Sequence, residues 1–160
     1  MRALGTPLVS FALLFPAGAR AEAWRSYVND RFGASVEYPE RFSVRDEAPA
    51  NNDGQRFHTV DRRATLAVFG FLNVEEETPR RIMESRKVDD TVYSLASSQA
   101  GAFTLSGRRG DRIVYLRCLR SRHDKSIYVC ADLEYPAEER AAWDKVVTRI
   151  AGSLKAGKGW

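Results

Sequence analysis

The sequence predicts an α+β domain built on a mainly antiparallel sheet. Short runs in which apolar and polar residues alternate are separated by turn-forming residues, a pattern typical of β-hairpins. Two segments, 78–87 and 137–154, instead have the apolar spacing of helices. Because connections of hairpin length join strands that run antiparallel, the sheet should be mainly antiparallel. Strands and helices that follow one another in separate groups then predict the α+β class.

Residues 1–21 have the composition of a secretory signal peptide. Arg2 is followed by an uncharged run over 3–19 with an apolar centre at 8–15. Pro16 and small residues come next, and Ala19–Ala21 forms an Ala-x-Ala site. We expect export with cleavage after Ala21, or alternatively after Ala19. A membrane anchor is the other interpretation, but the apolar centre is much shorter than the ~20 residues that a spanning helix needs.

Residues 22–154 are expected to form one domain, followed by a flexible C-terminal tail at 155–160. Removal of the leader takes away Arg2 and Arg20 and no acidic residue, so the net charge falls from +4 to +2. A charge this small on an exported chain argues against nucleic acid as a partner. No later segment is apolar over enough residues to span a bilayer. The mature chain is therefore expected to be a soluble monomer in the periplasm or outside the cell.

The first two thirds of the mature chain contain successive hairpins. Asn29–Gly33 joins the first two strands, and Pro39 ends the second of them. Asp61–Arg63 joins the next two, the later of which is apolar enough to be buried on both faces. The strands predicted before the cysteines are residues 24–28, 34–38, 56–60, 65–72, 91–97 and 102–106.

Two helices are predicted from their end signals and apolar spacing. Thr78 is a good N-cap and Pro79 suits the first helical position, so the first helix should extend from there to about Lys87. The second helix should occupy 137–154 after Pro136, with acidic residues in its first turn and basic residues near its end. The apolar stripe expected to pack on the sheet consists of Trp143, Val146, Val147, Ile150 and Leu154.

The two cysteines of the chain are predicted to form a disulfide across a hairpin. Strand-like runs at 112–120 and 126–135 flank a turn centred on Asp124. Antiparallel pairing about this turn places Cys118 opposite Cys130, close enough for a bridge at a non-hydrogen-bonded position. An oxidising compartment favours the disulfide over a pair of free thiols, which is the alternative.

Aromatic residues, a Phe-Gly pair and an aromatic-Pro pair follow one another at the start of the mature chain. They are Tyr27, Arg31-Phe32-Gly33, Val36, Tyr38-Pro39 and Phe42, and Leu133-x-Tyr135-Pro136 precedes the last helix. In these motifs the chain resembles the PsbP-like domains and small exported bacterial proteins. The resemblance implies an α/β/α sandwich, in which an antiparallel sheet lies between helices, used for binding and assembly rather than catalysis. Motifs of this kind identify an architecture and not an activity.

His58 is the candidate base for a catalytic site. It lies in a predicted strand near Asp61, and serines are plentiful, so a periplasmic hydrolase is an alternative function. The sequence contains no Gly-x-Ser-x-Gly elbow, and the cysteines are assigned to the disulfide, so a hydrogen-bonded strand histidine is the preferred interpretation. Zinc spacings, calcium loops and phosphate-binding glycine loops are also missing. We therefore expect no catalytic residue, metal or cofactor.

A set of basic residues on adjoining turns and strands is the candidate binding surface. It could hold an anionic envelope polymer or an acidic protein, whereas an ordinary solvated surface is the alternative. Ser106–Arg109 contains a Ser-Gly pair, which is similar to the motif of periplasmic lysozyme inhibitors and suggests an inhibitory loop. The basic residues are Arg108, Arg109, Arg112, Arg120, Arg122 and Lys125.

Together these features predict an exported, non-catalytic binding or assembly protein of the bacterial cell envelope. Its partner would be an envelope protein or an anionic polymer. The alternatives are a periplasmic hydrolase centred on His58 and an inhibitor of a secreted hydrolase that acts through the Ser106–Arg109 loop.

Overall fold

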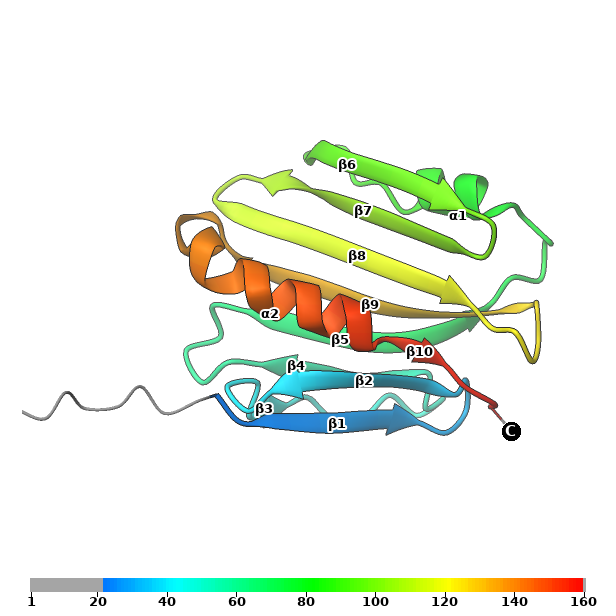
Figure 1. The fold of residues 1–160 in the computed structure, drawn as a ribbon, viewed down its shortest axis with the longest axis horizontal. Coiled ribbons are helices and arrows are strands. Elements are labelled where there is room, and N and C mark those ends of the chain that lie inside the picture. Colours follow the sequence, from blue (N-terminus) through cyan, green and yellow to red (C-terminus); the bar gives the residue numbers. More distant parts are fainter. Residues whose placement is uncertain (1–21, 160) are drawn as a thin grey trace, which may run out of the picture.

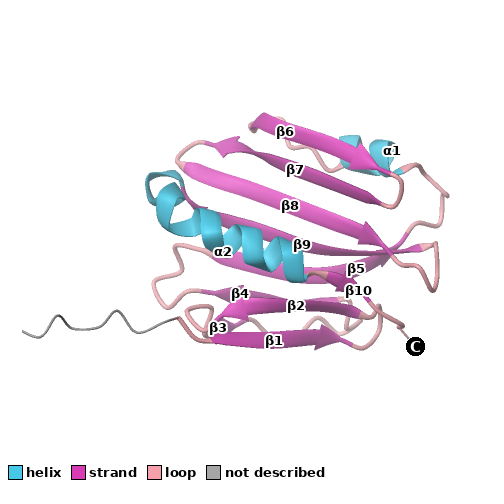
Figure 2. Cartoon of the chain, in the orientation of Figure 1, coloured by secondary structure: helices cyan, strands magenta, loops and turns pink. Residues whose placement is uncertain are grey.

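The computed structural model describes residues 22–159, so the predicted signal peptide and Trp160 lie outside the described residues. Within this range the strands form two antiparallel sheets, and two α-helices pack on the larger one (Figures 1 and 2). The elements in chain order are β1 (Trp24–Asn29), β2 (Ala34–Pro39), β3 (Val44–Arg45), β4 (Gly54–His58), β5 (Thr65–Leu72), α1 (Pro79–Ser85), β6 (Val92–Gln99), β7 (Ala102–Arg109), β8 (Arg112–Arg120), β9 (Ile127–Pro136), the 3₁₀ helix η1 (Ala137–Glu139), α2 (Arg140–Ser153) and β10 (Lys155–Ala156).

The large sheet has seven strands in the order β3-β4-β5-β9-β8-β7-β6, and each neighbouring pair is antiparallel. The small sheet has three strands in the order β1-β2-β10. β9 lies between β5 and β8, so the second hairpin of the chain is joined to the cysteine hairpin by a pairing between distant segments. The α+β class and the mainly antiparallel sheet are confirmed. The sequence did not predict that the first hairpin belongs to a separate sheet.

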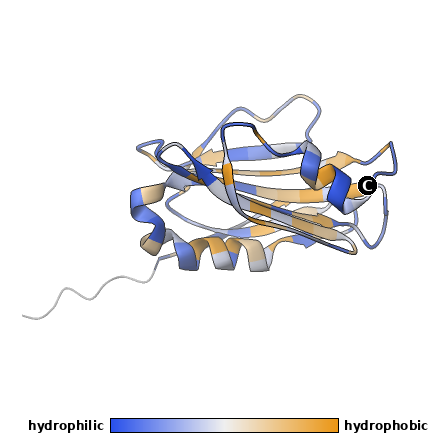
Figure 3. Cartoon of the chain, turned by 90° about the horizontal axis from the view of Figure 1, so that it is seen from above, coloured by the Kyte–Doolittle hydropathy of each residue, from blue (hydrophilic) through white to orange (hydrophobic). Residues whose placement is uncertain are grey.

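One face of the large sheet, which we call the α2 face, is covered by α2 and the small sheet. Trp143 of α2 stacks on Tyr135 of β9 with ring centroids 5.3 Å apart, and Tyr38 of β2 packs on Phe57 of β4 at 4.6 Å. All five residues of the predicted helical stripe are buried. Figure 3 shows apolar residues concentrated along the strands and α2, while the connecting loops are hydrophilic.

The opposite face, the α1 face, is covered only in part. Strand alternation places Cys118 on this face, since its neighbour Leu119 packs in the α2-face core. Ile82 and Met83 of α1 bury a second cluster of aromatic and sulfur-containing side chains. The two helices therefore lie on opposite faces of the large sheet, as the resemblance to PsbP-like domains implied.

The start of α1 follows its sequence signals, but its end comes earlier than predicted. Thr78 is the N-cap, and its Oγ1 accepts a hydrogen bond from the backbone N of Arg81 at 3.3 Å, with Pro79 at the first helical position. The helix ends at Ser85 with Arg86 as its C-cap, rather than at Lys87. The polar and charged residues of its last turn gave no signal for this boundary.

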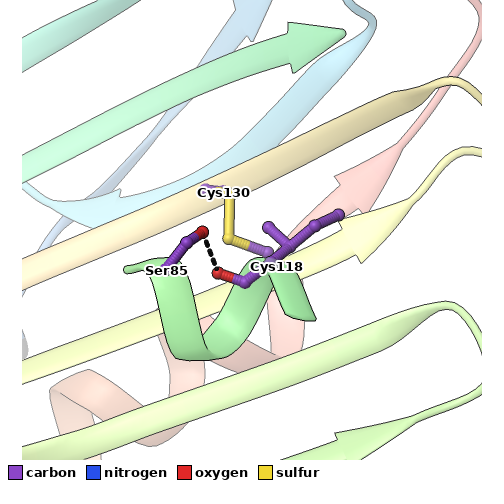
Figure 4. The surroundings of a disulfide bond; sticks show 4 residues. Ser85, Cys118 and Cys130 are labelled. Carbon is purple, nitrogen blue, oxygen red and sulfur yellow. Dashed lines mark hydrogen bonds between the residues drawn. A yellow bond between two sulfur atoms is a disulfide. The ribbon is translucent and has the colours of Figure 1, made fainter. Parts of the chain in front are cut away.

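The predicted disulfide is present between β8 and β9 (Figure 4). Cys118 and Cys130 are opposite one another with Cα atoms 4.1 Å apart, and Leu119 is opposite Val129, so the predicted register is confirmed. Both cysteines are fully buried, and α1 packs over them (Figure 4). The bridge therefore joins the central strand β9 to its neighbour β8 under the shorter helix.

The prediction of a flexible tail at 155–160 is wrong for the first residues of that segment. Lys155 and Ala156 form β10, which pairs with Ser35 and Ala34 of β2. The backbone N of Gly157 donates a hydrogen bond to the carbonyl oxygen of Gly33 at 2.7 Å. Gly33 has φ +68°, and a Cβ there would lie 2.7 Å from the Gly157 backbone, so the contact needs glycine. Backbone contacts between glycines leave no apolar pattern in the sequence.

We expect removal of the disulfide to lower the free energy of unfolding without changing the fold. Closing the loop between Cys118 and Cys130, with a sequence separation of 12, restricts the unfolded chain by about 3 kcal/mol in the chain-entropy model. Urea denaturation of the double variant Cys118→Ala/Cys130→Ala should show a loss of this size. The reduced wild-type chain serves as the control and should unfold at a similar urea concentration. Identical midpoints for oxidised wild type and double variant would contradict the expectation.

Candidate functional site

The six basic residues singled out in the sequence fall into two groups at opposite ends of β8. Arg108, Arg109 and Arg112 lie at the β7–β8 turn, whereas Arg120, Arg122 and Lys125 lie at the end of β8 and in the loop to β9 (Figure 1). A strand rises ~3.4 Å per residue, so the ends of β8 are separated by roughly 27 Å. The six residues therefore do not form one surface.

The group at the β7–β8 turn has hydrogen-bonding partners within the domain. Glu134 of β9 forms ion pairs with both Arg109 and Arg112, the second through Arg112 Nε and Glu134 Oε1 at 3.1 Å. The Nε of Arg108 donates a hydrogen bond to the carbonyl oxygen of Gly110 at 2.8 Å. Two of the three guanidinium groups are thus engaged by a carboxylate within the domain.

The second group lines a groove of about 750 Å³ between the β6–β7 turn, the end of β8 and β10. Four cations line it, and none of them forms an ion pair within residues 22–159. Its lining includes no acidic residue, and apolar side chains including Leu119 and Leu154 form part of its wall. We call this feature the basic groove, and its cations are Arg120, Arg122, Lys125 and Lys155.

Lys155 is a residue of the groove that the sequence analysis missed. It belongs to β10, within the segment expected to be a flexible tail. The pairing of Lys155 with Ser35 of β2 fixes its backbone next to the loop that carries Arg122. No local signal marks this position, because the docking of the tail depends on the small sheet.

His58 has hydrogen-bonding contacts at both ring nitrogens. Its Nε2 lies 2.9 Å from Asp46 Oδ2, and its Nδ1 lies 3.2 Å from Thr65 Oγ1. The hydrogen bond from His58 is the main reason that the pKa of Asp46 is below its usual value. His58 contacts a threonine rather than the serine that the hydrolase alternative envisaged. Thr65 is the first residue of β5 and is paired with His58 of β4 and Glu134 of β9, so it lies in the sheet and not in an open loop.

The Ser106–Arg109 segment is not a protruding loop. All four residues belong to β7, and Ser106 is paired with Leu95 of β6 on one side and Tyr115 of β8 on the other. The turn itself is confined to Gly110 and Asp111. The inhibitor alternative requires a loop that can enter an enzyme cleft, so this part of the sequence analysis is wrong.

Asp132 is a candidate that sequence reasoning missed. It lies in β9 on the open part of the α1 face, between a concavity of about 90 Å³ and another of about 440 Å³. Desolvation of its carboxylate in these concavities, and secondly the charge of Glu134, raise its pKa to about 6, although the residue as a whole is exposed to solvent. Its position two residues after buried Cys130 is the sequence signal that could have found it.

The carboxylate of Asp132 has no hydrogen bond or ion pair among the side chains of residues 22–159. Arg86 shares the smaller concavity with it, and Arg56 shares the larger one. Across the described residues, no group of three or more His, Cys, Asp or Glu side chains could hold a metal ion. In the same part of the chain, no helix has the length and apolarity needed to cross a membrane.

Comparison with known proteins identifies the fold. No protein-family model matches the chain, and no curated protein matches its sequence. The structure is similar to cyanobacterial PsbP (CyanoP) from Synechocystis sp. PCC 6803, with a TM-score of 0.63 and 15% identity over 90% of this chain and 98% of that one. It is also similar to the Ran-binding protein Mog1p of Saccharomyces cerevisiae, with a TM-score of 0.56 and 10% identity over 85% and 96% of the two chains. The chain has a PsbP-like fold, as its motifs implied.

We expect Asp132→Asn to stabilise the domain more at pH 7.5 than at pH 4.5. The pKa of Asp132 in the folded chain, about 6, is above the ordinary value of 3.8, so folding favours the protonated carboxyl. Its contribution to stability is present below pH 4 and is lost as the pH rises through 6. Solvent screening of this partly open group limits the effect to about 1 kcal/mol.

Urea denaturation at the two pH values measures this effect. The matched control is Asp30→Asn, an exposed aspartate in the turn after β1. The stabilisation by Asp132→Asn should increase between pH 4.5 and pH 7.5 by more than any change seen with the control. An increase no larger than that of the control would contradict the raised pKa.

Proposed function

We propose that the mature chain is an exported, non-catalytic binding protein of the bacterial cell envelope that holds an anionic partner in the basic groove. The observation that carries this proposal is the lining of the groove, in which four cations have neither an acidic neighbour in the lining nor an ion pair within the described chain. Cations without a carboxylate partner remain available to an anion in solution, although the Nε of Arg120 already donates a hydrogen bond to the carbonyl oxygen of Lys125. Elsewhere in the domain, Arg109, Arg112 and Arg149 all have carboxylate partners.

The shape and chemistry of the groove favour a ligand with both anionic and apolar parts. Its volume of about 750 Å³ is within the usual range of ligand sites. Guanidinium groups such as that of Arg122 suit carboxylate and phosphate oxygens, because the planar fork donates two parallel hydrogen bonds. Leu119 and Leu154 provide apolar contact area beside the charges. An acidic polymer or an acidic protein segment fits this combination.

A binding role agrees with what is known of the fold and of His58. The yeast Ran-binding protein Mog1p has a similar structure, so the fold is compatible with binding a partner. The contacts of His58 with Asp46 and Thr65 support a structural role, since they tie the loop after β3 to β4 and β5. These observations favour binding over hydrolysis.

Export is supported by the leader composition and by the disulfide, because a bridge of this kind persists in oxidising compartments. We expect the full chain, expressed in a Gram-negative bacterium, to accumulate in the periplasm without residues 1–21. Intact mass measurement of the purified protein would identify Glu22 as its first residue. A protein that retains the leader and remains in the cytoplasm would overturn the assignment.

Binding to an anionic polymer tests the function directly. Long-chain polyphosphate and poly-glutamate are suitable probes, with isothermal titration calorimetry on the mature chain. The variant Arg122→Ser/Lys125→Ser should weaken binding by at least about tenfold, because it removes two of the charges that converge in the groove. Added salt should weaken binding of the wild-type chain as well.

The matched control is Arg80→Ser/Lys145→Ser, which removes the same charge from exposed positions outside the groove. It should bind the probes nearly as tightly as the wild type. Equal weakening by the two double variants would show that only net charge matters. That result, or the absence of binding to both probes, would overturn the proposed function.

A further inference from the structure

The outer edge of β6 carries no charged residue and no proline, and a bulge interrupts it only near its start. β6 is the last strand of the large sheet, and the segment 91–107, which contains β6 and most of β7, has no charged residue. Natural edge strands are commonly protected by charged residues, proline or a covering element. Two of its apolar side chains are open to solvent, since Val92 is 77% exposed and Leu95 is 44% exposed. This edge is therefore suited to pairing with another strand.

The backbone of β6 is available over most of its length. Within the described residues, its backbone hydrogen bonds are those of the ladder with β7. The pairing is irregular only between Tyr93 and Leu95, opposite Gly107, where a Cβ would lie 2.5 Å from the carbonyl oxygen of Val92. The bulge is thus confined to the start of the strand, and Leu95–Gln99 continues without interruption.

Charges of opposite sign lie near the two ends of β6, and they form no ion pair within residues 22–159. Asp89 and Asp90 precede the strand, are exposed, and form no ion pair within residues 22–159. The turn after the strand lines the basic groove, together with Arg122 and Lys125. If two such strands pair antiparallel, the acidic end of each lies beside the basic end of the other. A parallel arrangement would instead bring like charges together.

We propose that β6 pairs antiparallel with β6 of a second copy of this chain, so that the two large sheets join into one continuous sheet. The pairing uses the same edge on both copies, so it closes as a two-fold dimer in which the β6 edge of each copy is paired. Main-chain hydrogen bonds supply its attraction, and contacts between the aspartates and the basic groove supply its orientation. The dimer does not rest on the proposed function, because it requires no anionic ligand.

The dimer should be weak and dependent on concentration. One pair of strands buries less area than a standard protein interface, so we expect a dissociation constant on the order of micromolar. The exposed Val92 and Leu95 add apolar contacts at the seam. Salt should weaken the dimer through the charged ends, although the main-chain hydrogen bonds remain.

Sedimentation velocity of the mature chain across the micromolar range tests the proposal. The wild type should change from monomer to dimer, whereas Ala96→Lys and Ala96→Glu should each remain monomeric, because two like charges meet near the two-fold axis. Ala96 is exposed, so neither substitution alters the core. An equimolar mixture of the two variants should restore a dimer. The control is Val60→Lys, which adds a charge at a 79% exposed valine between β4 and β5, outside the β6–β7 hairpin. This variant should dimerise as the wild type does.

A wild-type chain that stays monomeric throughout the range would overturn the proposal. So would an Ala96→Lys variant that dimerises like the wild type, since the interface would then lie elsewhere. Circular dichroism of each variant confirms that it is folded. Polyphosphate titration of the monomeric Ala96→Lys variant separates the two proposals. If this variant still binds polyphosphate, the groove function is supported whatever the outcome for the dimer. If binding is lost, the result counts against the groove function alone.

Discussion

The burial of the first half of β9 on both faces is the constraint on which the rest of the structure depends. Every residue from Ile127 to Ala131 is buried, and Leu133 and Tyr135 continue the buried side next to α2. A strand buried in this way needs a covering layer on each side. On one side α2 and the small sheet provide that layer, and on the other α1 covers the disulfide. The position of β9 inside the sheet also sets the strand order, because β5 pairs with one edge of β9 and β8 with the other.

The short length of α1 divides its face of the sheet into a closed half and an open half. Under the helix, Met83 of α1 packs with Phe103 and the disulfide, and all of them are shielded from water. Beyond the helix the same face carries Asp132 and Glu134, which are charged and lie in concavities. The alternation of β9 therefore passes from core to charged surface along one strand. The raised pKa of Asp132 is a consequence of this position, since it lies where the core gives way to solvent.

The surfaces available for partners lie at the ends and edges of the sheet, because its central strands are occupied by the core. The basic groove forms where β8 ends and β10 docks, and the unpaired edge of the sheet is that of its outermost strand, β6. The two surfaces meet at the β6–β7 turn. The proposed dimer and an anionic ligand therefore approach the domain from neighbouring directions, so a ligand held by Arg122 and a second copy that offers Asp90 would compete for the same charges.

The sequence by itself determined the features that depend on residues close together in the chain. The register of Cys118 and Cys130 follows from one turn, the start of α1 from Thr78 and Pro79, and the buried stripe of α2 from its periodicity. Their common basis is short-range geometry, which fixes spacing without knowledge of the remaining fold. The resemblance of its motifs to PsbP-like domains further predicted that helices lie on both faces of the sheet.

Only the tertiary structure decided which distant segments meet. It joined β5 to β9, docked Gly157 on Gly33, separated the predicted basic residues into two groups and brought Lys155 to one of them. It also placed Asp132 between two concavities. These outcomes depend on pairings whose stabilisation comes from burying shared surface, and that surface exists only when the whole sheet has formed. The sequence thus fixes the local elements, while the site arises from their assembly.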